Sequence, residues 1–453
     1  MKFFFAKILN SRRRHRFNSD LCQRIALMIV LSATVISLAA LMAGTRKTEG
    51  PNWLTPGIFW DVAIYNRALK AVAAGMDPYA AALARQQAAH AVGKFTFSYV
   101  YPPLTLFVLR AIALFPSWLA VALYTAAYCG GYVILLWAIM QFFRPEDRSA
   151  MQYAIPLVIF FPGLMTDIVI FSGNVAYIFY GLLFAATVAG WKRGNWHWFY
   201  LAILLGACFK LPFLTLLTIP AMAGQRQWLR ATSVGAAGVG IWALQGHLWP
   251  AQFHEYLECV RLQFEFNHDF GESPAGNLGR ALFWHGIDYT LIPTLVFLIY
   301  GGLIFGALWY YSSLYKRGRI SGESWIPVLL LGTLLLNPRI MQYDLHAFSL
   351  VMVLIVLRSV AARSKAGIAL AGAVFFLIVI DLLGVNFYYY DDLRNMCVLL
   401  GVMGIAFQYL AQEAGETYRE SLSTFPGATL PESPRVEVAL TFRYRTQQEF
   451  EGK

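Results

Sequence analysis

Long apolar segments alternate with short polar loops along most of the chain, from about residue 25 to residue 411. The first segment runs from roughly Ile25 to Ala43. Many of the segments reach about 20 residues, the length that an α-helix needs to cross the hydrocarbon core of a bilayer. Repeated segments of this kind are typical of polytopic membrane proteins. The pattern therefore predicts an all-α transmembrane bundle with about 12 spanning helices.

Positive charges gather in loops that should lie on one side of the membrane. They stand near the beginning of the chain, at Arg12, Arg13, Arg14 and Arg16, and in the loops 144–148, 191–197, 224–230, 315–324 and 358–365. Cytoplasmic loops of membrane proteins are enriched in lysine and arginine. We therefore expect all of these loops inside the cell, together with both chain termini.

This placement constrains two apolar segments. Residues 102–115 must stop short of crossing, because only one crossing fits before the basic loop that begins at Arg144. The segment 198–222 begins and ends beside basic loops, so it must turn back, and Lys210 with Pro212 marks the expected break. The outer face then receives the loops 45–102 and 248–290 and the turns 172–174 and 391–392.

Composition agrees with a membrane protein. Of the 453 residues, 58% are hydrophobic and only 13% are charged, with a mean hydropathy of +0.53. Soluble proteins carry about 25% charged residues. The net charge of +11 is explained by the basic loops, so we expect no nucleic-acid partner. The five cysteines form no spaced pair, and we expect neither a disulfide framework nor a metal site.

Three parts of the chain are expected. Residues 1–24 read as a basic cytoplasmic arm without a cleavable signal peptide, because no small-residue cleavage pattern follows the first apolar segment. Residues 25–411 form the transmembrane domain. Residues 412–453 are polar and rich in Pro, Ser, Glu and Arg, which favours a flexible cytoplasmic tail.

The first outer loop contains a short amphipathic helix with a carboxylate in its first turn. The helix begins at Trp60 and Asp61, and its apolar face consists of Val62, Ile64, Tyr65, Ala68, Leu69 and Val72. It is too short and too charged to span, so it should lie along the outer membrane surface. Gly75 suits a left-handed helix cap, and a second short helix is expected at 81–89. The following FTFSYVYPPL (95–104) should be extended, because its paired prolines block a helix until Leu104.

These motifs resemble the GT-C superfamily of membrane glycosyltransferases, and within it glycosyltransferase family 87. The matching residues are Asp61, Tyr65, Ala68, Gly75, Pro78, Tyr79, Tyr101, Pro102, Pro103 and Leu104, followed by Gly173 with Asn174, Lys210 with Pro212, and NPRIMQYDLHAF (337–348). Many relatives carry Gly-Gln-x-Asn at the outer turn, where this chain has Ser172-Gly173-Asn174-Val175.

The resemblance implies an inverting enzyme that moves a sugar, mannose above all, from a polyprenyl-phosphate donor to a glycan or glycolipid acceptor. Membrane lipids would surround the enzyme and its substrates. The resemblance also implies that no divalent metal or other cofactor is needed. The phosphate of such a donor leaves as an anion and needs no general acid. The acceptor hydroxyl, however, is a weak nucleophile until a base takes its proton. A carboxylate can act as this general base. We assign this role to Asp61.

The other site residues follow from the same scheme. Cationic groups should bind the departing phosphate, and the candidates are Lys210, Arg339 and His346, with Arg261 and Arg280 as weaker ones. The candidates for contact with the substrates are Tyr65, Tyr79, Tyr101, Asn174, Asp344 and His268.

Each assignment competes with a structural explanation. Asp61 could favour a helix N-terminus, and Asn174 could cap the helix that follows it. Arg339 could form a structural pair with Asp344. Asp391 and Asp392 could hold a metal, although a solvated turn explains them better. The aromatic residues of the outer loops suit both sugar stacking and the interfacial belt of membrane proteins.

Two other functions compete with a transferase. A lipid-sugar flippase or transporter would place ionisable residues and broken helices at the bilayer midplane, and the break at Lys210 is one such feature. A polymerase or ligase of surface polysaccharide would carry its chief large loop later in the chain, as the loop 248–290 does. The resemblance to bacterial enzymes implies a bacterial plasma membrane, with the active site on the outer face.

Overall fold

The computed structural model describes residues 60–93, 96–144, 147, 172–225, 227–362, 364–382 and 391–423. This part of the chain is helical and contains no strand, so the predicted all-α class is confirmed. The basic arm 1–24, the first apolar segment and residues 424–453 of the expected tail lie outside the described residues. Residues 412–423, also expected in the tail, form the end of a long helix.

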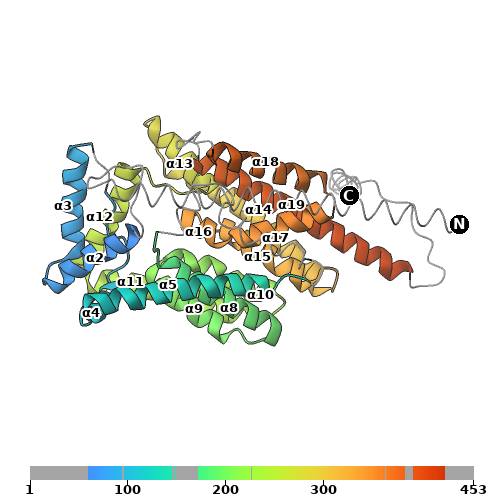
Figure 1. Ribbon diagram of the computed structural model, residues 1–453, viewed down its shortest axis with the longest axis horizontal. Coiled ribbons are helices and arrows are strands. Elements are labelled where there is room, and N and C mark those ends of the chain that lie inside the picture. Colours follow the sequence, from blue (N-terminus) through green and yellow to red (C-terminus); the bar gives the residue numbers. More distant parts are fainter. Residues whose placement is uncertain are drawn as a thin grey trace, which may run out of the picture.

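Figure 1 labels most of the described helices. They are α2 (Trp60–Ala73), α3 (Pro78–Ala91), α4 (Thr105–Ala113), α5 (Ser117–Met140), α8 (Ala176–Arg193), α9 (His197–Phe209), the 3₁₀ helix η2 (Leu211–Leu217), α10 (Thr218–Met222), α11 (Trp228–Leu248), α12 (Pro250–Asn267), α13 (Pro274–Trp284), α14 (Leu291–Lys316), α15 (Gly322–Leu335), α16 (Gln342–Ala347), α17 (Ser349–Ala361), α18 (Lys365–Leu382) and α19 (Asp391–Ser423).

Within the described residues, three helices are long and apolar enough to cross a membrane. They are Trp118–Met140 of α5, Leu291–Lys316 of α14 and Asp392–Arg419 of α19. Several shorter apolar helices pack among them, including α9, α15 and α17. The chain is thus a membrane protein with several apolar helices, and the predicted number of about 12 spans is not confirmed.

The first outer loop folds largely as its sequence predicts. Helix α2 begins at Trp60, and Gly75 follows its end with a φ of +72°. Asp77 caps α3, because its side chain accepts a hydrogen bond of 2.8 Å from the backbone N–H of Tyr79. Helix α3 therefore begins at Pro78, three residues earlier than expected, and runs on to Ala91. Residues 96–100 belong to no helix or strand, and α4 begins only after the two prolines.

Helix α4 is nine residues long, which is too short to span, as expected for the segment 102–115. Helix α5 then packs closely against α8. A Cβ atom on Gly131 would lie 2.7 Å from the Cα atom of Ile178, so this position admits only glycine without a shift of the backbone. Small residues of this kind let membrane helices approach each other closely.

Helix α9 ends where the sequence predicts a break. Lys210 has an extended backbone, with φ −145° and ψ 110°, and Pro212 lies in the first turn of η2. Lys210 lies beside Asn174, which precedes α8, whereas the carbonyl of Met222 accepts a hydrogen bond of 3.0 Å from Trp325 near the start of α15. The run 198–222 therefore goes to one end of the bundle and returns, as predicted.

Ion pairs and hydrogen bonds of charged residues hold together the end of the bundle to which the segment 198–222 returns. The guanidinium of Arg358, 6% exposed, donates to the carboxylate of Asp147 at 2.7 Å and to the carbonyl of Phe142 at 2.6 Å. Arg144 pairs with Glu413 at 3.1 Å and also donates to Ser321. Several of the basic loops thus meet at one end of the molecule.

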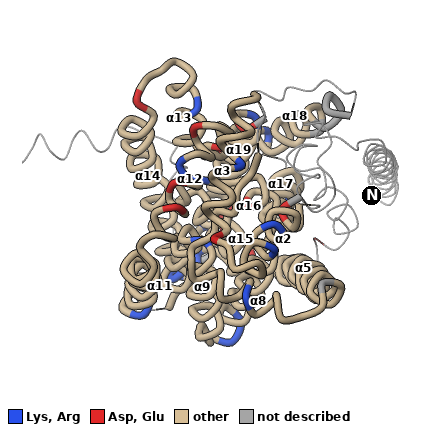
Figure 2. Tube along the Cα trace, turned by 90° about the vertical axis from the view of Figure 1, so that its left-hand side faces the viewer, with Lys and Arg blue, Asp and Glu red and all other residues tan. Residues whose placement is uncertain are grey.

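Helices α2, α3 and α12 cover the opposite end. Helix α3 stands across this end, at the left of Figure 1, whereas α5 and α19 run lengthwise. Figure 2 looks onto this end, with the helices of the bundle seen close to end-on. Helix α12 packs beside α3, where His90 stacks on Phe266 with ring centroids 3.8 Å apart.

Candidate active site

Asp61 lies in the first turn of α2, directly above the turn that precedes α8. Its backbone N–H donates to the carbonyl of Ser172 at 2.9 Å, and its carboxylate accepts a hydrogen bond of 2.9 Å from the side chain of Asn174. Gly173 shapes the turn with a φ of +70°. The start of α2 and the turn 172–174 are therefore held together at the carboxylate.

Asn174 has two roles in this arrangement. Its side-chain oxygen accepts from the backbone N–H of Ala176 at 3.0 Å, two residues further on, although the N-cap residue of α8 is Val175 and not Asn174. The same oxygen lies 3.4 Å from the ammonium of Lys210. Because the amide nitrogen of Asn174 donates to Asp61, one side chain connects the carboxylate to the lysine.

Lys210 occupies the centre of a group of charges. Its ammonium lies 3.6 Å from the ring centroid of Tyr343 and 5.8 Å from that of Tyr101. It interacts electrostatically with the charged groups of Asp344, Asp61, Arg339 and Asp269. The interruption between α9 and η2 is what brings this lysine to the site, because Lys210 is the residue at the break.

Two of the predicted tyrosines meet beside Asp61. The hydroxyls of Tyr65 and Tyr101 are 2.8 Å apart, and the Tyr65 hydroxyl accepts from the backbone N–H of Val175 at 3.3 Å. Tyr79 lies behind them. Its side chain is completely buried, and its hydroxyl donates to the carbonyl of Tyr101 at 2.6 Å. In this arrangement Tyr79 supports the backbone of Tyr101.

Arg339 and Asp344 do not form the ion pair that the sequence suggested. Arg339 donates to the carboxylate and to the backbone carbonyl of Asp269, both at 3.0 Å. Asp344 accepts from the hydroxyl of Tyr180 at 2.9 Å and from the backbone N–H of Met341 at 3.0 Å. The partner of Arg339 lies between α12 and α13, 70 residues away in sequence.

The two predicted histidines lie at the edges of the group. His346 is 1% exposed, its Nδ1 is 2.8 Å from the hydroxyl of Tyr177, and its Nε2 has no hydrogen-bond partner among the described residues. His268 ends α12 with a φ of +53°, and its ring faces Phe283 at 5.0 Å. His268 is next to Asp269 in sequence, but its ring packs against Phe283.

The environment of Asp61 makes it a stronger base than an ordinary aspartate. Some surface of the residue is accessible to solvent, but its carboxylate is enclosed. This burial raises the pKa of Asp61 to about 6, and the charge of Asp269 adds to the increase. The hydrogen bond from Asn174 and the charge of Lys210 act in the opposite direction on the pKa. The carboxylate is thus largely ionised at pH 7 and can still accept a proton.

The structure also shows residues that the sequence reading did not assign to the site. Tyr343 covers Lys210, and Asp269 binds Arg339. Tyr343 lies inside the QYDLHAF motif, but a tyrosine among many in the chain gives no sign that it faces a lysine. The weaker candidates Arg261 and Arg280 pair instead with carboxylates of Glu258, Glu265 and Asp392.

The model of glycosyltransferase family 87 matches residues 99–338, which is more than half of the 453-residue chain. Tyr101, Asn174, Lys210 and His268 lie inside the matched range, whereas Asp61 precedes it. No curated protein and no solved structure gives a match to the chain. Because the family model covers more than half of the chain, the chain belongs to glycosyltransferase family 87.

Proposed function

We propose that this protein is an inverting membrane glycosyltransferase that moves a sugar, mannose above all, from a polyprenyl-phosphate donor to an acceptor hydroxyl. The observation that carries the proposal is the connection of the Asp61 carboxylate to the Lys210 ammonium through Asn174. It places a base and a cation at the two ends of one short path. A sugar transfer needs both groups, one for the incoming hydroxyl and one for the leaving phosphate.

Asp61 acts as the general base in this proposal. It takes the proton of the acceptor hydroxyl while the acceptor oxygen forms its bond to the anomeric carbon of the sugar. The bond between that carbon and the phosphate oxygen breaks, and the phosphate leaves with the electron pair. Attack opposite the phosphate inverts the anomeric centre. Base catalysis of this kind contributes about 10²–10⁴-fold.

Lys210 stabilises the negative charge that develops on the phosphate. A charge-assisted hydrogen bond from its ammonium would favour the phosphate, which would compete for it with the nearby carboxyl groups of Asp344, Asp61 and Asp269. Arg339 is the second cation of the proposal, and it would have to share its guanidinium between Asp269 and the phosphate. His346 would contribute from deeper in the bundle, through the nitrogen that has no partner among the described residues.

The charge distribution favours a site on the outer face of a bacterial plasma membrane. Arg144 and Arg358 belong to basic loops and meet at one end of the bundle, whereas Asp61 and Lys210 lie at the other. By the positive-inside rule the basic end faces the cytoplasm. A lipid-linked sugar and its acceptor would then meet Asp61 outside the cell, with both termini of the chain inside.

The function can be tested with the purified protein in nanodiscs. Polyprenyl-phosphate mannose carrying a radiolabelled sugar is supplied with a membrane lipid extract as the acceptor. We expect label in a new glycolipid with an inverted anomeric configuration, as measured by NMR of the product. A product with a retained configuration would contradict the inverting mechanism.

The same assay distinguishes the transferase from a flippase. The break at Lys210, with its surrounding charges, is the observation that keeps a flippase as the second candidate. The assay also supplies other polyprenyl-phosphate sugars. If lipid-linked mannose then moves between leaflets and no sugar is transferred to any acceptor, the transferase proposal is wrong.

A further inference from the structure

A narrow crevice separates α2 from α3 at the end of the molecule that bears Asp61. Phe97 and Tyr99 close its third side. Its lining is otherwise small or apolar, apart from Arg67 and Arg85. Its interior has a free volume of only about 10 Å³, enough for about one water molecule. A ligand would therefore bind at its mouth.

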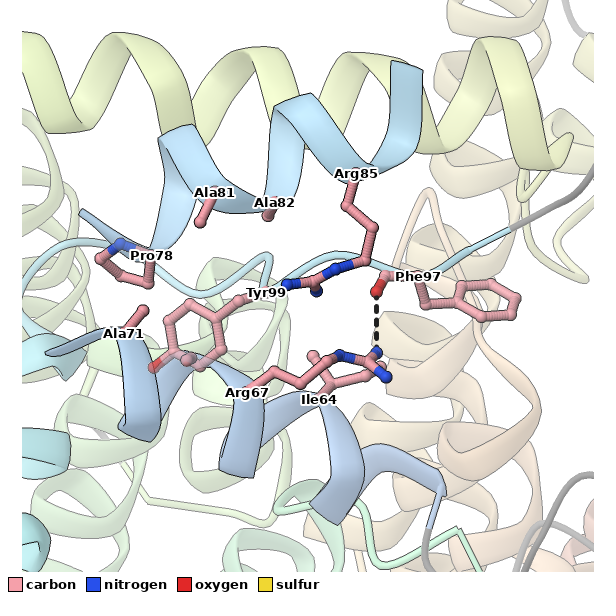
Figure 3. A pocket seen from close by; sticks show the side chains of 10 residues that line it. Ile64, Arg67, Ala71, Pro78, Ala81, Ala82, Arg85, Phe97 and Tyr99 are labelled. Carbon is pink, nitrogen blue, oxygen red and sulfur yellow. Dashed lines mark hydrogen bonds between the residues drawn. The ribbon is translucent and has the colours of Figure 1, made fainter. Parts of the chain in front are cut away.

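Two arginines point into this crevice from opposite sides. Figure 3 shows Arg67 reaching from α2 to the carbonyl of Phe97, whereas Arg85 descends from α3 and turns its guanidinium toward Tyr99. Arg67 donates one hydrogen bond, of 3.3 Å, to the carbonyl of Phe97. Its Nε is buried and has no partner among the described residues. Buried polar atoms are usually satisfied, so this nitrogen points to a missing acceptor.

The crevice carries positive charge without a counter-charge. None of its lining residues is acidic, and within the described part of the chain neither arginine forms an ion pair. Burial and the nearby charge of Arg85 lower the pKa of Arg67, which means that the two cations disfavour each other. By contrast, the arginines of the neighbouring loops, Arg261, Arg280 and Arg339, all pair with carboxylates.

We propose that Arg67 and Arg85 form a phosphate-binding site at the mouth of this crevice, separate from the site around Asp61 and Lys210. A guanidinium offers donors in a planar fork that matches two oxygens of a phosphate. Arg85 is exposed, so it can swing to clasp an anion against Arg67. A bound phosphate would remove the repulsion between the two cations and would give the Nε of Arg67 an acceptor.

The site is distinct from the proposed catalytic centre. Arg67 follows Asp61 by six residues, which corresponds to about 9 Å along an α-helix and about 240° around its axis. The two side chains therefore leave different faces of α2. The phosphate could belong to the headgroup of an anionic membrane lipid or to a soluble molecule, because α2 and α3 lie across the end of the bundle (Figure 1). The proposal does not depend on sugar transfer.

The test uses the full-length protein in nanodiscs, with two probes. Inorganic phosphate is titrated into nanodiscs of phosphatidylcholine by calorimetry, and phosphatidylglycerol bound to the protein is counted by native mass spectrometry. We expect Arg67→Gln and Arg85→Gln each to weaken binding of at least one probe about tenfold, as for the loss of a charge-assisted hydrogen bond. Arg67→Lys keeps the charge without the fork and should lose part of the affinity.

Lys70→Gln is the matched control, because it removes one positive charge from the same exposed helix and Lys70 does not line the crevice. It should bind both probes as the wild type does. Loss of the lipid probe alone assigns the site to a membrane headgroup, and loss of the phosphate probe alone assigns it to a soluble phosphate. Equal binding by the wild type and both glutamine variants, no binding of either probe by the wild type, or an equal loss in Lys70→Gln would overturn the proposal. Asp61→Asn should keep the binding, which separates this site from the transferase.

Discussion

At the scale of single residues, Asp61 and Asn174 determine how the proposed site responds to pH. Burial raises the pKa of Asp61 to about 6, and the hydrogen bond from Asn174 partly offsets the increase. A general base works in its ionised form. The rate of transfer should therefore be low below this pKa and should rise to a plateau above it.

The pH profile of kcat/KM tests this behaviour. For the wild type we expect a rise with a midpoint near 6, the pKa of Asp61. Asn174→Ala removes the hydrogen bond that favours the carboxylate, so its midpoint should move to higher pH. Removing the hydrogen bond to the backbone N–H of Ala176 should also cost about 1 kcal/mol of stability. Profiles whose midpoints coincide in the two proteins would show that Asn174 does not tune Asp61.

Tyr343 should position Lys210 through the face of its ring. The ammonium lies 3.6 Å from the ring centroid, a distance at which a cation–π interaction contributes about 0.5–2 kcal/mol. We expect Tyr343→Leu to lower kcat/KM about tenfold, with the loss mainly in kcat if Lys210 acts on the departing phosphate. Tyr343→Phe keeps the ring and is the control. A loss as large in the phenylalanine variant would assign the effect to the hydroxyl instead.

The residues also show what could be predicted from the sequence. The carboxylate of Asp61 and the cation of Lys210 stand out because charges are rare in such an apolar chain, and the structure brings them together through Asn174. The pairing of Arg339 with Asp269 instead of Asp344 could not be predicted. Asp344 is near in sequence, but tertiary packing places the second outer loop against Arg339, and Tyr180 takes the Asp344 carboxylate.

At the scale of helices, local signals determine where the elements begin and end. Asp77 starts α3, two prolines delay α4, and the break at Lys210 with Pro212 ends α9. The prolines and the break at Lys210 act within a few residues and are visible in the sequence, whereas the start of α3 lies three residues before the predicted one. The number of spanning helices depends instead on how short apolar helices such as α9 and α15 pack, and hydropathy does not contain that information.

The packing of α5 against α8 can be tested at two adjacent glycines. Gly131→Ala places a methyl group 2.7 Å from the Cα atom of Ile178, whereas a Cβ atom on Gly130 meets nothing within 4 Å. We expect Gly131→Ala to lower stability by about 1–3 kcal/mol, as overpacking does. Gly130→Ala should be neutral or slightly stabilising, because alanine favours a helix. Thermal unfolding of both proteins in the same detergent checks the difference, and equal melting temperatures would contradict the close approach.

At the scale of the whole molecule, the basic end and the end with the proposed site differ in the residues that they carry. At the basic end, ion pairs join the segment after α5 to α17 and α19, and Arg358 also donates to the Glu323 carbonyl of α15. The other end carries the carboxylates and aromatic residues of the proposed site. The matched family range covers helices that connect both ends. Stability and activity should therefore be separable by mutation.

Arg358 tests this separation. It binds Asp147 and two backbone carbonyls in a nearly buried position. Arg358→Met would leave the partly buried carboxylate of Asp147 with only the backbone N–H of Arg144 as a partner, which should cost about 1–3 kcal/mol. We expect a lower melting temperature, with an unchanged kcat for the protein that remains folded. Arg317→Met removes an exposed arginine near the same end and should leave both properties unchanged. A large loss of kcat in folded Arg358→Met would show that the two ends are coupled.

The role of Asp61 as the base is the central claim, and single-turnover transfer by Asp61→Asn tests it most directly. The amide keeps the size of the side chain and can still accept the hydrogen bond from Asn174, but it cannot take a proton. Asp288→Asn makes the same change at a fully exposed aspartate and is the control. The account predicts at least a 10²-fold slower transfer for Asp61→Asn, with donor binding and melting temperature retained, and a normal rate for the control. Transfer by Asp61→Asn within a few-fold of the wild-type rate would contradict it.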